Sequence, residues 1–263
     1  KSRSRGLGDV YKRQLDILSQ SRCNIEAVDV DDQGLPPEKL ANDINVIFTT
    51  PSHHCPTAAT MPLSRRKRLL AKARELDAII VEDDYEFEMS FLEPALPALK
   101  SLDNDGRVIY VGSFSKSLFP GMRLGYLVGP APFIKEARAL RASVLRHPPG
   151  HIQRTAAYFL SLGHYDALIK KMSKQYEERY LEMEKSLTKF DLKIAGKAQH
   201  GGSSFWVETP KCTNAVKLAQ KLLEMDVVIE PGDPFFVGEN HPKNFIRLAY
   251  SSISTNKIAA GIE

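Results

Sequence analysis

The chain has 263 residues, of which 43% are hydrophobic and 26% are charged. These fractions are ordinary for a globular protein, and they exclude a disordered tail, a collagen-like repeat and a coiled-coil rod. The length suits one large domain, or one large and one small domain. No stretch approaches the roughly 18 consecutive apolar residues that a transmembrane helix needs, so we expect no membrane-spanning segment.

The whole net charge of +4 lies at the start of the chain. Residues 1–14 contain five Lys and Arg side chains and one Asp, whereas the remainder carries 31 basic and 31 acidic side chains. Asp9–Gln14 matches the translation of a common transposase sequencing adapter, and the segment lacks the apolar core of a signal peptide. We therefore interpret residues 1–14 as a non-native leader, with a flexible basic arm as the alternative. Three widely spaced cysteines and no secretion signal predict a cytoplasmic protein.

From Leu15 onward, predicted strands alternate with predicted helices. The helix from Ser64 to Leu76 should be capped by Ser64, with Arg65 to Arg68 in water and Leu69, Leu70 and Ala73 facing inward. A turn at Gly34 leads into a further helix. Alternating strands and helices predict an α/β fold with a mostly parallel sheet flanked by helices. The expected strands are Asn24–Val30, Val46–Thr50, Ala78–Val81, Arg107–Gly112 and Gly125–Val128.

The second half of the chain has a different pattern, which predicts a smaller α+β domain. His151–Phe190 is mostly helical, with a break near Gly163. Further elements follow it, namely strands at Ser203–Glu208, Val227–Glu230 and Phe245–Tyr250, a helix at Asn214–Glu224 and a helix from Ser254. We place the domain boundary inside the long helix, giving a larger domain at 15–165 and a smaller one at 166–263.

Unusual polar residues follow three of the predicted strands. Glu82–Tyr85 follows the third strand, Gly112–Lys116 follows the fourth, and Thr50–Thr57 follows the second. Each segment taken alone has a structural explanation, such as acids that cap the next helix or a solvated turn. Ligands of open parallel sheets bind at the carboxyl ends of the strands, so the three together predict a binding site.

These segments resemble the fold-type-I aminotransferases that use pyridoxal 5′-phosphate (PLP). More narrowly, they resemble the aminotransferase-like domain of MocR-type regulators in the GntR family. The resemblance rests on TTPSHHCPTAATMPLSRRKRLL, VEDDYEFE and IYVGSFSKSLFPGMRLGYLVGP, between Thr49 and Pro130, and extends more loosely to the C-terminus. It implies the PLP-dependent transferase fold of type I, with a smaller α+β C-terminal domain. It also implies a homodimer whose active site lies at the subunit interface.

The resemblance assigns the catalytic roles to Lys116, Asp83 and Tyr85. Lys116 would form an aldimine with PLP and then move the substrate Cα proton as general base and acid. A carboxylate beside the ring nitrogen keeps that nitrogen protonated, a role that fits Asp83, with Asp84 as the less favoured choice. Tyr85 would donate a hydrogen bond to the ring 3′-oxygen.

Further residues would hold the phosphate and the substrate. The hydroxyls of Ser113 and Ser115 and the guanidinium of Arg123 suit the phosphate. Arg247 matches the family arginine that binds the substrate α-carboxylate, although an ion pair at a strand edge is the alternative. The family motif Asn-Pro-Thr-Gly is replaced by Cys55-Pro-Thr-Ala, so the contact of the missing asparagine would be lost or taken over by a neighbour such as His54.

The implied reaction moves an amino group between an amino acid and a 2-oxo acid through the Lys116 aldimine. The alternative is a non-catalytic domain of a transcriptional regulator that senses an amine or PLP, with DNA bound by a separate winged-helix domain. Another PLP reaction, such as decarboxylation or racemisation, is a third possibility. We also expect the chain to be a fragment lacking the upstream Gly-rich phosphate loop, and hence weak in PLP binding. His53 and His54 are adjacent and make a poor metal pair, so no metal is expected.

Overall fold

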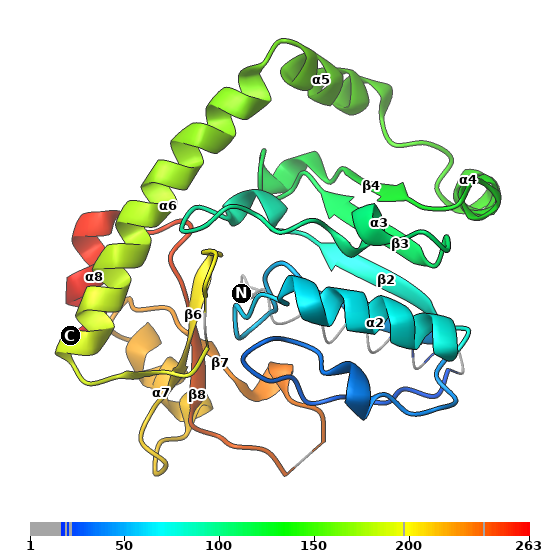
Figure 1. The fold of residues 1–263 in the computed structure, drawn as a ribbon. Helices are drawn as coiled ribbons and strands as arrows, with labels where there is room; N and C mark the ends of the chain where they lie inside the picture. Colours follow the sequence, from blue (N-terminus) through cyan, green and yellow to red (C-terminus); the bar gives the residue numbers. More distant parts are fainter. Residues whose placement is uncertain (1–16, 19, 21–22, 197, 239) are drawn as a thin grey trace.

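The computed structural model describes residues 17–18, 20, 23–196, 198–238 and 240–263 (Figure 1). The leader predicted at residues 1–14 lies outside the described residues. The described chain contains two four-stranded sheets, which lie side by side and are connected by a long helix (Figure 1). This arrangement, with a parallel-dominated sheet in the first half, confirms the predicted fold class.

The first sheet has the order β1-β2-β3-β4, and its first three strands are parallel. β4 pairs antiparallel with β3, which differs from a uniformly parallel sheet. Parallel neighbours need a long crossover, usually a helix, and the segment from β3 to β4 contains only the short 3-10 helix η3. The bounds are β1 Val46–Thr49, β2 Ile79–Asp84, β3 Val108–Ser113, η3 Pro120–Met122 and β4 Gly125–Val128.

Helix α2 (Leu63–Glu75) covers one face of this sheet, and its inward residues confirm the predicted amphipathic pattern in part. Leu69 and Ala73 are buried against the sheet, and Leu70 packs at the border of the same cluster. Two expectations were wrong. Ser64 does not cap the helix, because the N-cap residue is Pro62. Arg65 is also buried rather than solvated, because its guanidinium donates to Asp31 and to the Gly34 carbonyl oxygen.

Arg66 is completely buried, which also contradicts the expected wet face of α2. Its guanidinium donates hydrogen bonds to the carbonyl oxygens of Met61, Pro97 and Pro51 at 2.9, 2.9 and 3.0 Å. Buried loop carbonyls need donors, and one planar guanidinium with five N–H groups can supply several of them. Arg66 therefore stabilises the loops around the sheet from inside.

Several connecting elements differ from the sequence-based expectation. Asn24–Val30 forms no strand. β1 is the edge strand of the sheet and has β2 as its neighbour, and most residues of Asn24–Val30 are exposed. The turn at Gly34 leads into a single 3-10 turn, not a full helix. Three short elements and one longer helix complete this half, namely η1 Pro37–Lys39, η2 Phe87–Met89, α3 Leu99–Leu102 and α4 Ala131–Val144.

The long helical region breaks at Gly163 as predicted, where the backbone adopts a positive φ of 75°. Helix α5 (Gly150–Ser161) ends before this glycine, and α6 (His164–Lys189) runs from it to the second sheet (Figure 1). Glycine reaches this left-handed conformation at little steric cost, so the chain can turn sharply here.

The second sheet is antiparallel throughout, in the order β5-β6-β8-β7. Asn214 caps α7 by accepting a hydrogen bond from the Lys217 amide at 3.0 Å. The predicted strands and helices are present here, except that β7 (Glu230–Pro231) begins only at the last residue of the predicted strand Val227–Glu230, and β5 is an addition. The bounds are β5 Lys193–Ile194, β6 Ser204–Glu208, α7 Ala215–Leu223, β7 Glu230–Pro231, η4 Asp233–Phe235, β8 Phe245–Ala249 and α8 Thr255–Ile262.

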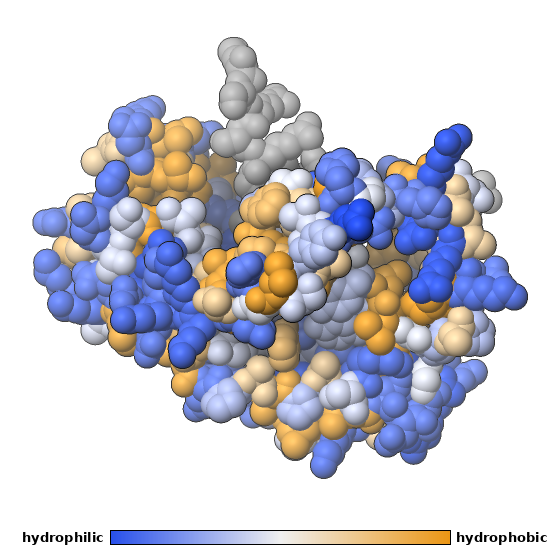
Figure 2. Space-filling model, turned by 90° about the horizontal axis from the view of Figure 1, so that it is seen from above, coloured by the Kyte–Doolittle hydropathy of each residue, from blue (hydrophilic) through white to orange (hydrophobic). Residues whose placement is uncertain are grey.

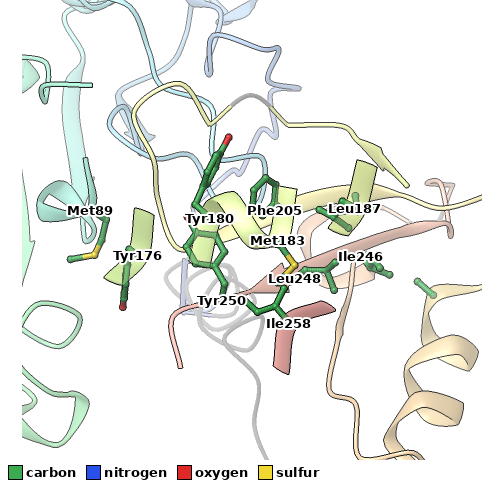
Figure 3. Close-up of a cluster of buried hydrophobic side chains, with 12 residues drawn as sticks. Met89, Tyr176, Tyr180, Met183, Leu187, Phe205, Ile246, Leu248, Tyr250 and Ile258 are labelled. Carbon is green, nitrogen blue, oxygen red and sulfur yellow. The ribbon is translucent and has the colours of Figure 1, made fainter. Parts of the chain in front are cut away.

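Four aromatic side chains, Tyr176, Tyr180, Phe205 and Tyr250, belong to the core between α6 and the second sheet (Figure 3). Tyr180 stacks near Phe205, with ring centroids 4.8 Å apart, and both rings lie within about 6 Å of Tyr250. Met89 belongs to the same cluster although it comes from η2 in the first half of the chain (Figure 3). The loop that follows β2 is therefore packed against the second sheet.

The opposite face of the first sheet is open in this chain. Val81, Val111 and Leu127 line an apolar hollow of about 470 Å³ together with residues of β1 and α4. None of the 14 residues of α4, all of which the structure describes, is buried. Seen from the α5 side, hydrophobic patches lie among hydrophilic ones on the surface (Figure 2). Among the described residues, no helix is both long and apolar enough to cross a membrane.

Candidate functional site

Lys116 lies just beyond the carboxyl end of β3, and its ammonium contacts a buried carboxylate. The Nζ atom of Lys116 is 3.2 Å from Oε1 of Glu86, which follows the end of β2. The Lys116 side chain is 23% exposed and the Glu86 side chain is 3% exposed. The lysine predicted to hold the cofactor therefore lies at the predicted edge of the sheet, with a partner that the sequence did not reveal.

Two adjacent aspartates at the end of β2 point to opposite faces of the sheet, because side chains alternate along a strand. Asp84 is buried on the α2 side, where its Oδ2 accepts a hydrogen bond from the Tyr110 hydroxyl at 3.3 Å. Burial raises the pKa of Asp84 to about 7, and the nearby Glu82 carboxylate acts in the same direction. Asp83 lies on the open face, next to Val111 of β3. The geometry favours Asp83 over Asp84 as a residue that can meet a ligand.

Tyr85 contacts the loop after β1 near the predicted site. The Tyr85 hydroxyl donates a hydrogen bond to the backbone oxygen of His53 at 3.4 Å. His54 Nδ1 lies 2.8 Å from the Thr57 hydroxyl, within a tight turn whose Cys55-Pro56 bond is cis. Burial lowers the pKa of His54 to about 4, so this ring is neutral at pH 7. His54 is thus held by its own loop in this structure.

The predicted phosphate donors lie at the end of β3 and in the segment between β3 and β4. Ser113 ends β3, and its hydroxyl oxygen accepts a hydrogen bond from the Ser115 amide at 3.2 Å. Arg123 is exposed and follows η3 with a positive φ of 47°, which is unusual for a residue other than glycine. Its guanidinium makes no hydrogen bond or ion pair to another described residue. This strand end therefore offers two hydroxyls and an uncommitted cation.

Arg247 lies in β8 of the second sheet and is almost completely buried, at 3% exposure. Its NH1 group donates to Glu230 Oε2 of the neighbouring β7 at 2.9 Å. Burial acts to lower the pKa of Arg247, but Cys55, Glu230 and Tyr85 outweigh it and the net direction is upward. The structure thus brings Arg247 toward Tyr85 and Cys55, while its guanidinium takes part in the ion pair that was the alternative interpretation.

Two acids near the predicted site received no individual role in the sequence analysis. Glu82 is fully buried and accepts hydrogen bonds from the Leu99 and Lys100 amides, at 2.7 and 2.8 Å, at the start of α3. Burial raises its pKa above the ordinary value. Glu86 is the partner of Lys116 described above. The acid-rich run VEDDYEFE was the available signal, but strand alternation alone could not assign the residue after Tyr85.

The chemistry of the donor set fits PLP. A phosphate requires hydroxyls and a cation, which Ser113, Ser115 and Arg123 present on one loop. A protonated ring nitrogen requires a carboxylate, which Asp83 presents at the open end of β2. Lys116 supplies the amine. The roles assigned to these residues from the sequence stay predictions, and the structure places them at one edge of the first sheet.

Comparisons with known proteins point to the same chemistry. The family model for aminotransferase class I and II matches residues 16–263. A kynurenine aminotransferase structure from Pyrococcus horikoshii, in complex with PMP, has a TM-score of 0.82 at 31% identity. The match covers 89% of this chain and 61% of that one. LysN of Thermus thermophilus, an α-aminoadipate aminotransferase complexed with N-(5′-phosphopyridoxyl)-L-leucine, has a TM-score of 0.83 at 28% identity, covering 91% and 63%.

A transcriptional regulator is also similar. The HTH-type transcriptional regulator TauR of Rhodobacter capsulatus is 55% identical over 246 residues, which are 94% of this chain and 51% of TauR. The chain thus spans about half the length of this relative. These similarities confirm the predicted resemblance to PLP aminotransferases and to MocR-type regulators.

Proposed function

Since this chain belongs to the aminotransferase class I and II family, we propose that it binds PLP through Lys116 and transfers amino groups between an amino acid and a 2-oxo acid. The observation that carries the proposal is that Asp83, Ser113, Ser115 and Lys116 all lie at or just beyond the carboxyl ends of the neighbouring strands β2 and β3. PLP, when bound, supplies the electron-withdrawing ring for this chemistry.

The residues of the chain have separate tasks in this proposal. Asp83 would keep the ring nitrogen protonated, and Tyr85, directly after β2, and His54, in the loop after β1, would hydrogen-bond the ring oxygen. Ser113, Ser115 and Arg123 hold the phosphate. Lys116 then carries a proton to and from the substrate Cα as a general base and acid.

Arg247 would bind the substrate α-carboxylate with its planar guanidinium. Because Arg247 belongs to the second sheet, this contact would connect substrate binding to the position of the smaller domain, which we assign to 166–263. The larger domain would be completed by segments outside this chain.

We further propose that the domain belongs to a MocR-type regulator of the GntR family. The 55% identity to TauR supports this assignment, because the relative is named as an HTH-type regulator. A separate winged-helix domain would bind DNA, the protein would act in the cytoplasm, and two copies would form a homodimer. The alternative function, in which PLP or an amine is sensed without turnover, rests on the same similarity.

Covalent capture tests the cofactor proposal. The intact protein is incubated with PLP, reduced with borohydride, digested and analysed by mass spectrometry. We expect the phosphopyridoxyl group on the peptide that contains Lys116, and its loss in Lys116→Ala. Lys174→Ala, at an exposed lysine of α6, is the matched control and should label like wild type. Labelling that is spread over surface lysines would contradict the proposal.

A second measurement separates an enzyme from a sensor. The PLP-loaded protein is mixed with single amino acids, and the release of the matching 2-oxo acid is quantified. Stoichiometric or repeated release supports amino-group transfer. A change in DNA affinity without any 2-oxo acid supports the sensing alternative.

A further inference from the structure

Glu86 is a buried carboxylate that touches the central lysine of the site and has no role in the reaction described above. It is 3% exposed and follows Tyr85 directly, at the point where the chain leaves β2 for η2. Its Oε1 lies 3.2 Å from Lys116 Nζ. A buried carboxylate is costly unless it is paired and hydrogen-bonded, so this contact is a substantial interaction for both residues.

The same carboxylate is anchored from the other half of the molecule. The Ser203 hydroxyl, just before β6, donates a short hydrogen bond of 2.5 Å to Glu86 Oε1. The flanking backbone is joined in the same place, because the Gly202 amide donates to the Met89 carbonyl oxygen at 3.0 Å. Oε1 of Glu86 is therefore contacted from the first sheet and from the second.

Lys116 is the ionic partner of Glu86 at neutral pH, because the other titratable groups around Glu86 are uncharged or paired with another residue. His53, from the loop after β1, has a pKa lowered to about 4 by burial and is uncharged at pH 7. Tyr176 of α6 and Tyr250, after β8, are also neutral, since burial raises their pKa values. Arg247 is charged and faces the same region, but it pairs with Glu230. Burial acts to raise the pKa of Glu86, yet Lys116 and Ser203 outweigh it and keep the pKa below its ordinary value.

We propose that Glu86 is a positioning residue for Lys116, whose carboxylate pairs with the lysine side chain and holds it at the end of β3 whenever its amine carries no cofactor. Ser203 fixes the carboxylate in the orientation that this contact requires. The inference rests on the proposed function of Lys116 and adds to it a buried ionic partner for the amine. The contact with Glu86 would slow the reaction of Lys116 with a carbonyl, because a lysine amine reacts with a carbonyl only after it has lost its proton.

The consequence is a measurable shift in the reactivity of Lys116. An opposite charge within about 4–6 Å moves a pKa by roughly 1–3 units in favour of the charged forms. Replacing Glu86 by Gln removes that charge and keeps a hydrogen-bonding side chain of the same size. The pH at which Lys116 becomes reactive should then fall by about one unit or more.

The test measures Lys116 itself and not turnover. The intact protein is freed of cofactor and labelled briefly with acetic anhydride across a pH series, and acetylation of the Lys116 peptide is quantified by mass spectrometry. Glu86→Gln is expected to lower the midpoint of the profile and to raise labelling at pH 7.5 about tenfold for each pH unit of that shift. Glu86→Asp, which restores the carboxylate, should return the midpoint toward wild type.

The matched control is Glu88→Gln, two residues further along, whose carboxylate accepts a hydrogen bond from Tyr165 instead of contacting Lys116. It should leave the profile of Lys116 unchanged. Ser203→Ala is a second, milder variant for the case in which Glu86→Gln does not fold, and it should move the midpoint in the same direction by a smaller amount. Circular dichroism checks the fold of each variant.

The outcomes separate this inference from the proposed function. The role of Glu86 is overturned if a folded Glu86→Gln variant has the same midpoint as wild type. If Glu86→Gln does not fold, the role is overturned when Ser203→Ala leaves the wild-type midpoint unchanged. Borohydride capture on wild type then reports independently whether Lys116 holds PLP. A shifted midpoint without PLP capture would support the pair and refute the cofactor proposal.

Discussion

Arg247 illustrates how one residue can satisfy two interpretations. Its side chain lies near Tyr85 and Cys55, as expected for the proposed substrate-binding role, and it also pairs with Glu230 at 2.9 Å. Both side chains are mostly buried, so the pair is poorly screened by water. An incoming carboxylate must therefore share the guanidinium with Glu230 or displace it. If Arg247 binds substrate as proposed, Glu230 would lower the affinity of the site for anionic substrates.

Replacing Glu230 by Gln should strengthen the binding of carboxylates. Removal of the competing anion is expected to lower the dissociation constant of an amino acid for the PLP-loaded, intact protein by about tenfold, which corresponds to about 1.4 kcal/mol. The corresponding amine without a carboxylate should bind unchanged. Isothermal titration with both ligands measures the difference.

The control for this prediction is Glu208→Gln, whose carboxylate pairs with the exposed Lys193 at the edge of the second sheet. It should leave both affinities unchanged. Weaker carboxylate binding in Glu230→Gln would mean that Glu230 supports the orientation of Arg247 instead of competing for it.

Residue identity alone did not assign the acids around the site. The sequence favoured Asp83 over Asp84 through a resemblance, and the pleat of β2 supplies a physical reason, since it buries Asp84 beside Tyr110 and leaves Asp83 on the open face. The burial of Arg65 and Arg66 could not be predicted from a comparable local pattern. Their burial depends on carbonyl groups brought in by distant loops, which no local pattern contains.

At the scale of elements, the turn after β1 is shaped by a contact with the second half of the chain. Thr57 of this turn holds the His54 ring, and the Thr57 carbonyl lies against Gly196 in the segment after β5. A Cβ atom on Gly196 would lie 2.0 Å from the Thr57 oxygen. No real structure tolerates that distance, so the two backbones can approach this closely only because residue 196 is a glycine.

Gly196→Ala should therefore destabilise the fold and disturb the His54 turn. We expect the free energy of unfolding to fall by about 1–3 kcal/mol, as for other overpacked sites. Urea denaturation of the intact protein measures it. Gly150→Ala serves as the control because a Cβ atom there would meet nothing within 4 Å. Equal free energies of unfolding for the two variants would show that the backbones at residues 57 and 196 can move apart without loss of stability.

At the scale of the whole molecule, the distribution of apolar surface suggests a partner. Leu140 and Val144 of α4 are each 68% exposed, and Leu145 at its end is 75% exposed. Large contiguous apolar surface is uncommon on monomers and typical of interfaces. This helix, at the edge of the chain in Figure 1, is where we place part of the proposed homodimer interface.

Charged substitutions on α4 test the dimer. Sedimentation velocity of the intact protein should give the mass of two chains, and the double variant Leu140→Asp, Val144→Asp should shift it toward one chain at micromolar concentration. A buried charge without a partner is strongly unfavourable at an interface. The control Lys174→Asp, on the exposed side of α6, should stay dimeric. A monomeric wild type would rule the interface out.

The linear chain was enough to predict the four strands of the first sheet, the break at Gly163, the family and the place of Lys116 after β3. Each of these depends on local periodicity, on glycine conformation or on a contiguous motif, all of which are local properties. The antiparallel direction of β4 and the meeting of Glu86 with Lys116 and Ser203 emerged only from the folded molecule. The physical reason is the long separation of these residues along the chain, since Ser203 is 117 residues from Glu86. Packing of the two sheets is what brings their side chains within hydrogen-bonding distance.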